Sequence, residues 1–492
     1  MSVEIFISLA IYFIGMLAIG LYSYRKTSDL SDYMLGGRGL GPAVTALSAG
    51  ASDMSGWMLM GLPGAMFATG LSSAWIAIGL TVGAYLNYLL IAPRLRTYTE
   101  VANDSITIPD YFENRFSDRT KILRFVSAVV IITFFTLYTS AGLVSGGRLF
   151  ESAFQMDYKV GLFVTAGVVI CYTLFGGFLA VSLTDFVQGC IMFAALVLVP
   201  VVAFTELDGI SSTLQEVHAI DPSLMDLFKG TSILGIMSFL AWGLGYFGQP
   251  HIIVRFMAIT SVKQLKTARR IGIGWMVISI VGALATGLVG VAYLSVNNIQ
   301  IKDPETIFIL FSEILFHPLI TGFLLSAILA AIMSTISSQL LVTSSALTED
   351  FYKAFLHRQA TDKELVMIGR LAVFAVAAVG IILSYTPNDT ILSLVGNAWA
   401  GFGAAFGPTV LLSLYWKRMT KWGALAGMIS GAVTVMIWIS TPSLKSLMYE
   451  MIPGFLISFM AVVIVSLLTN HPHKNVQRSF DQMEAQLAEQ LK

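Results

Sequence analysis

Hydrophobic residues along this chain form long runs that are separated by short polar segments. A helix needs about 20 mainly apolar residues to cross a bilayer. Thirteen runs qualify: residues 5–22, 41–67, 74–92, 125–147, 160–179, 182–204, 232–257, 271–294, 319–346, 366–385, 391–415, 423–440 and 452–469. The pattern predicts an all-α polytopic membrane protein with about 13 transmembrane helices.

The composition agrees with a membrane protein. Hydrophobic residues make up 56% of the chain and charged residues 12%, whereas soluble domains carry about 25% charged residues. The net charge is zero and the basic residues are spread over short loops, so nothing indicates a nucleic-acid partner. Run 5–22 follows Glu4 instead of a cation and is expected to remain as a helix, not to be cleaved as a signal peptide. Cys171 and Cys190 lie in apolar runs and are expected to be small buried hydrophobes.

The distribution of basic residues predicts the orientation. Lysine and arginine are retained on the cytoplasmic side of a membrane. If the N-terminus lies outside, only five of the 29 basic residues fall outside: Arg148, Lys159, Lys229, Lys302 and Lys445. We therefore expect a multi-pass protein of the cytoplasmic membrane with its N-terminus outside and its C-terminus in the cytoplasm.

Two of the predicted helices are interrupted. The second run contains "GASDMSG" (Gly50 to Gly56), and the seventh contains "GLGYFGQP" (Gly243 to Pro250). Discontinuous helices in corresponding places of two halves indicate the binding site of a transporter. A kink without a ligand is the alternative.

The two breaks are five spans apart, in the second and seventh runs, which predicts two repeats of opposite orientation. We therefore expect a single transmembrane domain over residues 1–470. Its parts are an extra helix at 5–22, a first repeat at 41–204, a second repeat at 232–415 and two extra helices within 423–469. Residues 471–492 form a cytoplasmic tail, which is either a short amphipathic helix or a frayed segment.

Ionisable residues inside a membrane are costly and indicate function. Asp53 lies at the first break and is expected to be functional. For Asp185, near the end of the sixth run, a structural hydrogen bond is an equal alternative. His251 and Arg255 are expected to anchor the end of the seventh run. Glu349 and Asp350 end the ninth run and are expected to be solvated.

The ninth run carries a dense group of hydroxyls in "LAAIMSTISSQLL" (Leu329 to Leu341). Such residues can also pack between helices. Carbonyls freed near Ala51 and Met54, together with two adjacent hydroxyls, would supply the hard oxygens that a sodium ion needs.

Several motifs resemble the sodium/solute symporter family, and bacterial sodium/proline symporters in particular. They occur in order along nearly the whole chain: "LGGRGLGPAVTALSAGASDMSGWMLMGLPGA" from Leu35, "FFTLYTSAG" from Phe134, "YTLFGGFLAVSLTDFVQG" from Tyr172, "WGLGYFGQPHIIVRFMA" from Trp242, "SAILAAIMSTISSQLL" from Ser326 and "AWAGFGAAFGP" from Ala398. The resemblance implies the fold of the inverted-repeat amino-acid transporters. It also implies sodium as the coupling ion, with no other cofactor.

The resemblance also implies roles for individual residues. Sodium would be held between spans two and nine by Ala51, Met54, Ala331, Ser334 and Thr335, with Asp53 nearby and Asp185 linked to ion entry or release. The substrate would contact Ser55, Gly56, Trp57, Tyr138, Trp242, Tyr246 and Pro250. Arg38 would belong to the cytoplasmic gate.

The chemistry of these residues suits proline. A carboxylate can meet the N–H groups of the half-helix that begins near Ser55, at the positive end of its dipole. Tyr138, Trp242 and Tyr246 can form an apolar wall and attract the ammonium group by cation–π interaction.

Three alternatives to proline symport remain open. The first is the same mechanism with another solute, such as a related imino acid, a betaine, a vitamin or, least favoured, a sugar. The second is an intramembrane enzyme, although neither H-E-x-x-H nor G-x-S-x-G occurs in the chain. The third is a membrane sensor or a channel.

Overall fold

The structure is a computed structural model that describes residues 2–25, 34–357, 359–387 and 389–492, and the elements assigned in these ranges are all helical. The principal elements are α1 (Val3–Tyr24), α3 (Pro42–Asp53), α4 (Leu62–Thr69), α5 (Ala74–Leu86), α6 (Ala92–Val101), α7 (Ile108–Arg115), α8 (Ile122–Phe154), α9 (Tyr158–Thr205), α10 (Ile210–Ile220), α11 (Ile233–Leu240), α12 (Pro250–Ala258), α13 (Leu265–Val296), α14 (Ile307–Ile314), α15 (Pro318–Ser345), α16 (Asp362–Ser384), α17 (Ile391–Tyr415), α18 (Lys421–Ser440), α19 (Pro442–Lys445), α20 (Met451–Leu468) and α21 (Lys474–Gln490). Shorter 3-10 or π-helical segments lie between or within them: η1 (Gly36–Arg38), η2 (Trp57–Gly61), η3 (Gly70–Ser73), η4 (Asn87–Ile91), η5 (Pro222–Met225), η6 (Ala241–Gly248), η7 (Val262–Gln264), η8 (Pro304–Thr306) and η9 (Ala346–Leu356).

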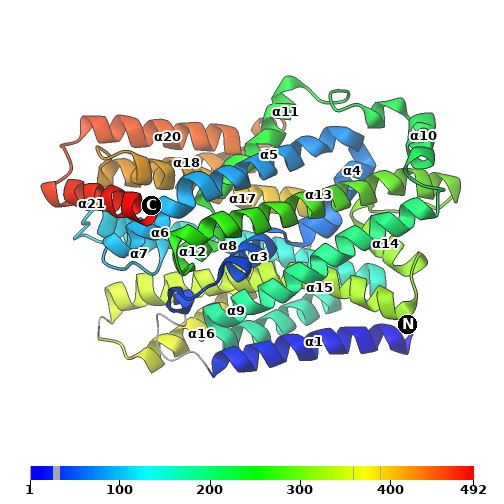
Figure 1. Cartoon of the computed structure of the whole chain (residues 1–492), viewed down its shortest axis with the longest axis horizontal. Helices are drawn as coiled ribbons and strands as arrows, with labels where there is room; N and C mark the ends of the chain where they lie inside the picture. Colours follow the sequence, from blue (N-terminus) through cyan, green and yellow to red (C-terminus); the bar gives the residue numbers. More distant parts are fainter. Residues whose placement is uncertain (1, 26–33, 358, 388) are drawn as a thin grey trace.

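Most helices run side by side along one direction, and the two chain termini lie at opposite ends of the bundle (Figure 1). By length and composition, ten helical stretches in the described residues could cross a membrane. Trp57–Val101 counts as one stretch where two spans were predicted, and Tyr158–Cys171 and Ile233–Gly248 are shorter than a full crossing. The structure thus supports a multi-pass membrane protein, with each of the predicted runs on helical backbone.

The predicted fifth and sixth spans are joined in the single long helix α9. Its backbone turns at Gly177, which has φ 58° and ψ −171°. Only glycine adopts this conformation without strain, so the direction of the chain changes at Gly177 without a loop. The two cysteines are both on exposed helix surface, which corrects the expectation that they are buried.

Both predicted breaks occur, but they differ in geometry. In the first, α3 ends at Asp53, Met54 has non-helical torsion angles, and the helix resumes through the π-helical η2 into α4. In the second, the glycine-rich stretch is tightened into the 3-10 segment η6, and only Gln249 is extended before α12 begins. The glycines there permit close packing: a Cβ at Gly83 on α5 would lie 2.2 Å from the carbonyl oxygen of Gly243.

The two interrupted helices lie inside the bundle. Helix α3 packs against α9, α12, α13 and α15, while η6 packs against α5 and α17. Helix α1 lies along α9 and α15 (Figure 1). The polar backbone at the breaks is therefore enclosed by other helices, which is where a membrane protein tolerates such backbone.

The C-terminal tail forms the helix α21, so the amphipathic alternative is correct and the frayed one is wrong. Helix α21 packs on α6. Its apolar face buries Val476, Phe480, Met483 and Leu487, whereas Leu491, just after the end of the helix, is exposed.

Candidate functional site

The first break places a carboxylate at the centre of the bundle. The side chain of Asp53 is 2% exposed, and one of its oxygens, Oδ2, accepts a short hydrogen bond from the hydroxyl of Tyr246 on η6. The backbone carbonyl of Asp53 accepts hydrogen bonds from Trp57 Nε1 at 3.2 Å and from the Tyr138 hydroxyl at 3.4 Å. Asp53 thus joins the two broken helices and α8.

A small cavity of about 30 Å³ lies beside Asp53. Asn87 and Tyr88 also line it, and they come from the π-helical η4 in the third predicted span. Asp53 Oδ1, Asn87 Oδ1 and the Tyr88 hydroxyl are buried without a hydrogen-bond partner among the described residues. The cavity has room for a water molecule or an ion. Asn87 and Tyr88 were not singled out in the sequence.

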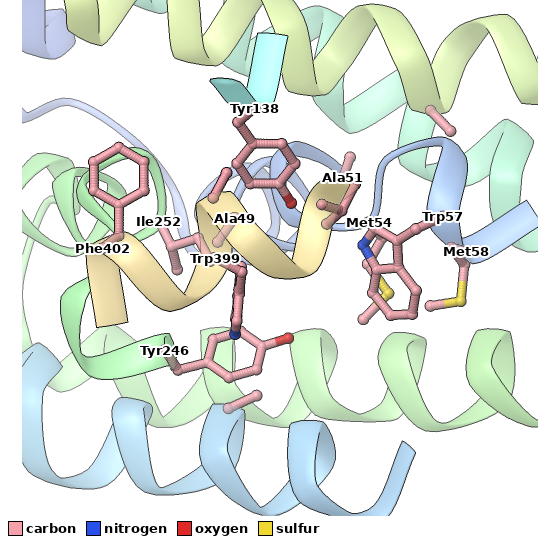
Figure 2. Close-up of a cluster of buried hydrophobic side chains, with 14 of the residues drawn as sticks. Ala49, Ala51, Met54, Trp57, Met58, Tyr138, Tyr246, Ile252, Trp399 and Phe402 are labelled. Atoms are coloured by element: carbon pink, nitrogen blue, oxygen red, sulfur yellow. The ribbon is translucent and has the colours of Figure 1, made fainter. Parts of the chain in front are cut away.

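Aromatic rings from both breaks form one group (Figure 2). Trp57 and Trp242 have ring centroids 6.4 Å apart, and Trp242 stacks on Tyr449 at 5.3 Å. Tyr246 meets Trp399 of α17 edge to face at 5.1 Å. The structure therefore brings together Trp57, Trp242 and Tyr246 with Trp399 and Tyr449. The Tyr138 ring, also predicted for the wall, meets His251 edge to face at 5.9 Å.

Trp399 also supports the backbone of the second break. Its Nε1 donates to the carbonyl of Trp242 at 2.8 Å, and its own carbonyl accepts a hydrogen bond from Gln249 Nε2 at 3.0 Å. These two bonds fix the second break to α17. In the sequence, Trp399 lies in the motif "AWAGFGAAFGP" from Ala398, but its small neighbours are typical of helix packing and no role was predicted for it.

The other predicted substrate contacts are spread around this group. Ser55 and Gly56 are buried at the first break, and a Cβ at Gly56 would lie 2.7 Å from Ser145 Oγ of α8. Pro250 is buried at the start of α12, but it lines a different cavity, of about 20 Å³, on the side of the break towards α7.

The hydroxyl side chains of span nine, in α15, contact the C-terminal end of α3. Ser334 Oγ donates to the carbonyl of Ala51 at 2.7 Å, and Thr335 Oγ1 lies 3.5 Å from the same oxygen. Both hydroxyls also contact the carbonyl of Ala331, at 3.2 and 3.1 Å. Ser337 instead bonds the carbonyl of Ser334 in its own helix. Four predicted ion ligands are thus side by side.

This oxygen cluster suits a monovalent cation. The carbonyl end of a broken helix carries partial negative charge and coordinates sodium in transporters. Among the described residues, no group of three His, Cys, Asp or Glu side chains could hold a metal ion. The carbonyl and hydroxyl oxygens of α3 and α15 are hard ligands of the kind that sodium prefers.

Asp185 and Arg255 form a second buried polar group. Asp185 Oδ2 accepts hydrogen bonds from Ser48 Oγ at 2.8 Å and from Arg255 Nη2 at 3.1 Å. Arg255 also donates to Ser48 and to Ser338. Four helices, α3, α9, α12 and α15, meet there. Arg255 is fully buried, so it anchors the end of the seventh run through contacts with other helices inside the bundle.

Arg38 ties the segment before α3 to the far end of α12. Its guanidinium donates to the carbonyls of Met257, at 2.8 Å, and of Ser105, at 2.9 Å. It also pairs with Asp104. These contacts join the segment before α3 to the end of α12 and to the loop between α6 and α7.

At the opposite end, Glu305 of η8 pairs with Arg148 of α8. The same carboxylate accepts the backbone N–H groups of Ile391 and Leu392, at 2.9 and 3.2 Å, at the start of α17. These contacts join η8, α8 and the start of α17.

Two interrupted helices that meet at a buried polar centre, within a bundle of apolar helices, define a secondary transporter. The chain belongs to the sodium:solute symporter family, because the model of that family matches residues 33–431.

Individual relatives cover the whole chain. It is 67% identical to the osmoregulated proline transporter OpuE of Bacillus subtilis, over 98% of this chain and 99% of the relative. It is 65% identical to the high-affinity proline transporter PutP of the same species, over 95% and 98%. The structure resembles a Na+-coupled sialic acid symporter solved in a substrate-bound outward-open state, with a TM-score of 0.81, 18% identity, and coverage of 96% and 99%. This last likeness concerns the fold alone.

Proposed function

We propose that this protein is a sodium-coupled secondary active symporter that imports L-proline by alternating access. The observation that carries the proposal is the segment from Ala51 to Trp57. At its start, the carbonyl of Ala51 contacts the hydroxyls of Ser334 and Thr335. At its end, the ring of Trp57 packs near Trp242 in the aromatic group. A few residues therefore connect an ion site to a solute site. The relatives named as proline transporters support the choice of solute.

Proline would lie between the two breaks. Its carboxylate would face the N–H groups at the start of η2, near Ser55 and Gly56, because a helix N-terminus favours an anion. Its ring and ammonium group would face the aromatic side chains. In this proposal the contacts are Ser55, Gly56, Trp57, Tyr138, Trp242, Tyr246 and Pro250.

Sodium would bind at the carbonyls of Ala51, Met54 and Ala331 and the hydroxyls of Ser334 and Thr335. The hydroxyls that now donate to the Ala51 carbonyl would turn their oxygens towards the ion. Asp53 would supply a fixed negative charge at the same break. Asp185 would act on the route of the ion, where its pairing with Arg255 sets the local charge.

The membrane potential can drive this transport. Zwitterionic proline carries no net charge, so the potential acts on sodium. One sodium moving inward across 100 mV releases about 2.3 kcal/mol. This corresponds to an accumulation of about 40-fold, because each 1.4 kcal/mol is a factor of ten.

The proposed arrangement has about 13 transmembrane helices, with repeats at 41–204 and 232–415. The N-terminus would lie outside the cytoplasmic membrane and the C-terminus inside. The placement of the termini at opposite ends in Figure 1 supports termini on opposite sides of the membrane, and the distribution of basic residues supports the N-terminus outside. Arg38 would then belong to the inner gate, and Glu305 and Arg148 would close the outer side.

Uptake of radiolabelled proline into proteoliposomes tests the proposal. An imposed sodium gradient should drive accumulation, and unlabelled proline should compete, while betaine and a sugar should compete weakly. Uptake that is insensitive to sodium, or not competed by proline, would contradict the proposal. Stronger competition by betaine would favour the alternative solute.

A further inference from the structure

The end of span nine contains a buried carboxylate that the sequence led us to regard as solvated. Asp350 lies in η9, and its side chain is 0% exposed. Its Oδ1 accepts a hydrogen bond from Thr107 Oγ1 at 2.9 Å and lies 3.3 Å from Arg124 Nε. Its Oδ2 is buried with no hydrogen-bond partner among the described residues.

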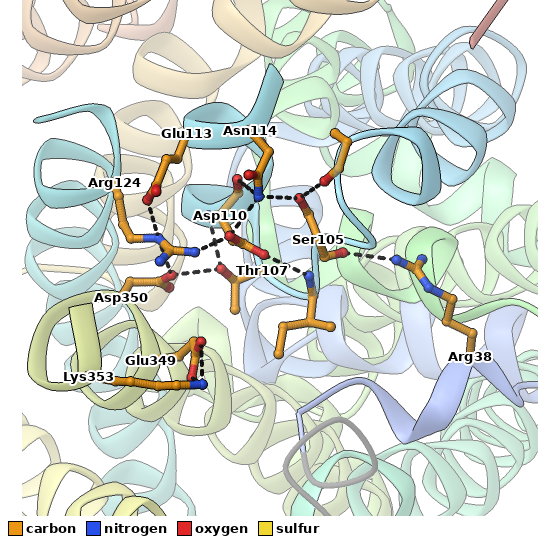
Figure 3. A network of polar contacts seen from close by, with 12 residues as sticks. Arg38, Ser105, Thr107, Asp110, Glu113, Asn114, Arg124, Glu349, Asp350 and Lys353 are labelled. Carbon is orange, nitrogen blue, oxygen red and sulfur yellow. Dashed lines mark hydrogen bonds and ion pairs between the residues drawn. The ribbon is translucent and has the colours of Figure 1, made fainter. Parts of the chain in front are cut away.

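Negative charge exceeds positive charge around this carboxylate. Arg124 pairs with Asp110 and Glu113 of α7 as well as with Asp350, so three carboxylates share one guanidinium (Figure 3). The nearest other cation in the figure, Lys353, is held by Glu349 at 2.9 Å. Burial raises the pKa of the Asp110 carboxyl, which is outside the spans. Uncompensated buried charge is costly, so this group would be stabilised by a further cation.

A cavity of about 20 Å³ extends from the second break to Asp350. Pro250 and Val254 of α12 line one part, and Thr107, Ser345 and Asp350 line another. A cavity of this size holds one water molecule or one small ion. The helix beside it is π-helical from Ala346 to Leu356, a geometry that occurs often at functional sites.

We propose that the carboxylate of Asp350, with the hydroxyls of Thr107 and Ser345, forms an inner binding site for a monovalent cation. This inference rests on the proposed function, because the ion expected there is the coupling sodium on its way to the cytoplasm. The site is separate from the oxygens of Ala51 and Ser334: along α15 and η9, Asp350 follows Ser334 by 16 residues, or about 24 Å of helix at 1.5 Å per residue.

A cysteine in the cavity tests the site while Asp350 stays in place. Val342→Cys, at an apolar residue that lines the same cavity and supplies none of the proposed ligands, is made in a chain with Cys171→Ser and Cys190→Ser, which removes the two native thiols. Cationic and anionic methanethiosulfonate reagents are then applied to the cytoplasmic face of inside-out membrane vesicles. We expect the cationic reagent to react about tenfold faster, because of attraction to the carboxylate. We also expect sodium chloride, but not choline chloride, to slow that reaction several-fold.

Asp350→Asn in the same background should remove both the preference for the cationic reagent and the protection by sodium. The matched control is Glu349→Gln, which changes charge equally at the neighbouring residue, whose carboxylate is held by Lys353. It should retain both effects. If sodium protects the thiol equally well in Asp350→Asn, the protection arises from sodium bound at the oxygens of Ala51 and Ser334, which changes the conformation of the protein. That result would overturn the proposal.

Transport measurements provide an independent test. In Asp350→Asn, net sodium-driven proline influx should fall several-fold, whereas exchange of proline at high sodium on both sides, which requires no sodium release, should stay near that of the unmodified protein. Asp350→Glu should restore part of the net influx. If exchange falls as much as net influx, and Asp350→Glu restores neither, Asp350 has a structural role and the inference is wrong. A failure of the proposed function can be told apart from a failure of this inference, because in the first case the unmodified protein would itself show no sodium-driven proline uptake.

Discussion

Asp185 on α9 and Arg255 on α12 form an ion pair of 3.1 Å in which neither side chain is exposed. Removing one partner of a buried pair leaves an unpaired charge and typically costs about 3 to 5 kcal/mol. We therefore expect Asp185→Asn and Arg255→Gln each to lower the thermal unfolding midpoint clearly in detergent solution. The double variant should recover most of the loss, because no charge is left alone.

This experiment also separates the two roles of Asp185. If its charge serves the ion, the double variant should be stable but should transport sodium and proline slowly. Asp104→Asn is the control, because Asp104 pairs with Arg38 at the surface and is 73% exposed; surface pairs contribute about 0 to 1 kcal/mol. If Asp185→Asn and Arg255→Gln are each as stable as the unmodified protein, the ion pair does not contribute to stability and this prediction is wrong.

Asp53→Asn should reduce sodium-driven proline uptake to near background while the protein is still produced and folded. The amide oxygen can still accept the hydrogen bond from Tyr246, so the packing of the breaks is retained, but the fixed charge beside the ion is lost. Tyr246→Phe is the complementary variant, which removes the donor of that bond and keeps the charge. Sodium activation like that of the unmodified protein in Asp53→Asn would show that the carboxylate is structural.

The aromatic group should determine proline affinity more than sodium affinity. Trp242→Ala removes a ring that contacts Trp57 and Tyr449, and truncation of a buried aromatic side chain costs about 3 to 5 kcal/mol. If even part of that free energy is lost from proline binding, proline affinity should fall tenfold or more. A binding isotherm for proline at saturating sodium measures this change. Trp422→Ala, at a side chain that is 47% exposed on α18, is the control. Unchanged proline affinity in Trp242→Ala would exclude a role in the solute site.

The hydroxyls of span nine should affect sodium first and proline indirectly. Ser334→Ala and Thr335→Ala each remove an oxygen near the Ala51 carbonyl, so apparent sodium affinity should fall. Because linkage is reciprocal, proline affinity should fall at low sodium and recover at high sodium. Ser337→Ala should have less effect, since that hydroxyl bonds its own helix. Equal effects at all three positions in a sodium titration would indicate helix packing instead.

Helix α21 should contribute measurably to stability. The Phe480 ring packs edge to face on Tyr98 at 6.1 Å and lies 5.3 Å from the guanidinium of Arg115. Phe480→Ala should therefore lower the free energy of unfolding by about 3 kcal/mol, which a lower thermal midpoint would show. Leu491→Ala, at an exposed position of the same segment, should not. An unchanged midpoint in Phe480→Ala would mean that the tail does not stabilise the bundle.

The sequence was sufficient to predict the parts of the site that depend on local pattern. The break at Asp53 follows from glycine and polar residues inside an apolar run, and the juxtaposition of Ala51 with Ser334 follows from the family resemblance. The pairing of Asp185 with Arg255 joins residues 70 positions apart, and no pattern in either helix points to the other. Asp350 was misjudged because the end of a helical run is normally solvated, and its burial arises from α8, which contains Arg124, and α16 packing against η9.

The clustering of tryptophans at the breaks has a practical consequence. Three of the eight in the chain share the centre of the bundle: Trp57 and Trp242 face each other, and Trp399 donates its indole N–H to the backbone of Trp242. Indole emission changes in wavelength and intensity with the polarity and packing of its surroundings. The protein therefore contains an intrinsic optical reporter at its centre, and rearrangement of the breaks should alter its fluorescence without any attached dye.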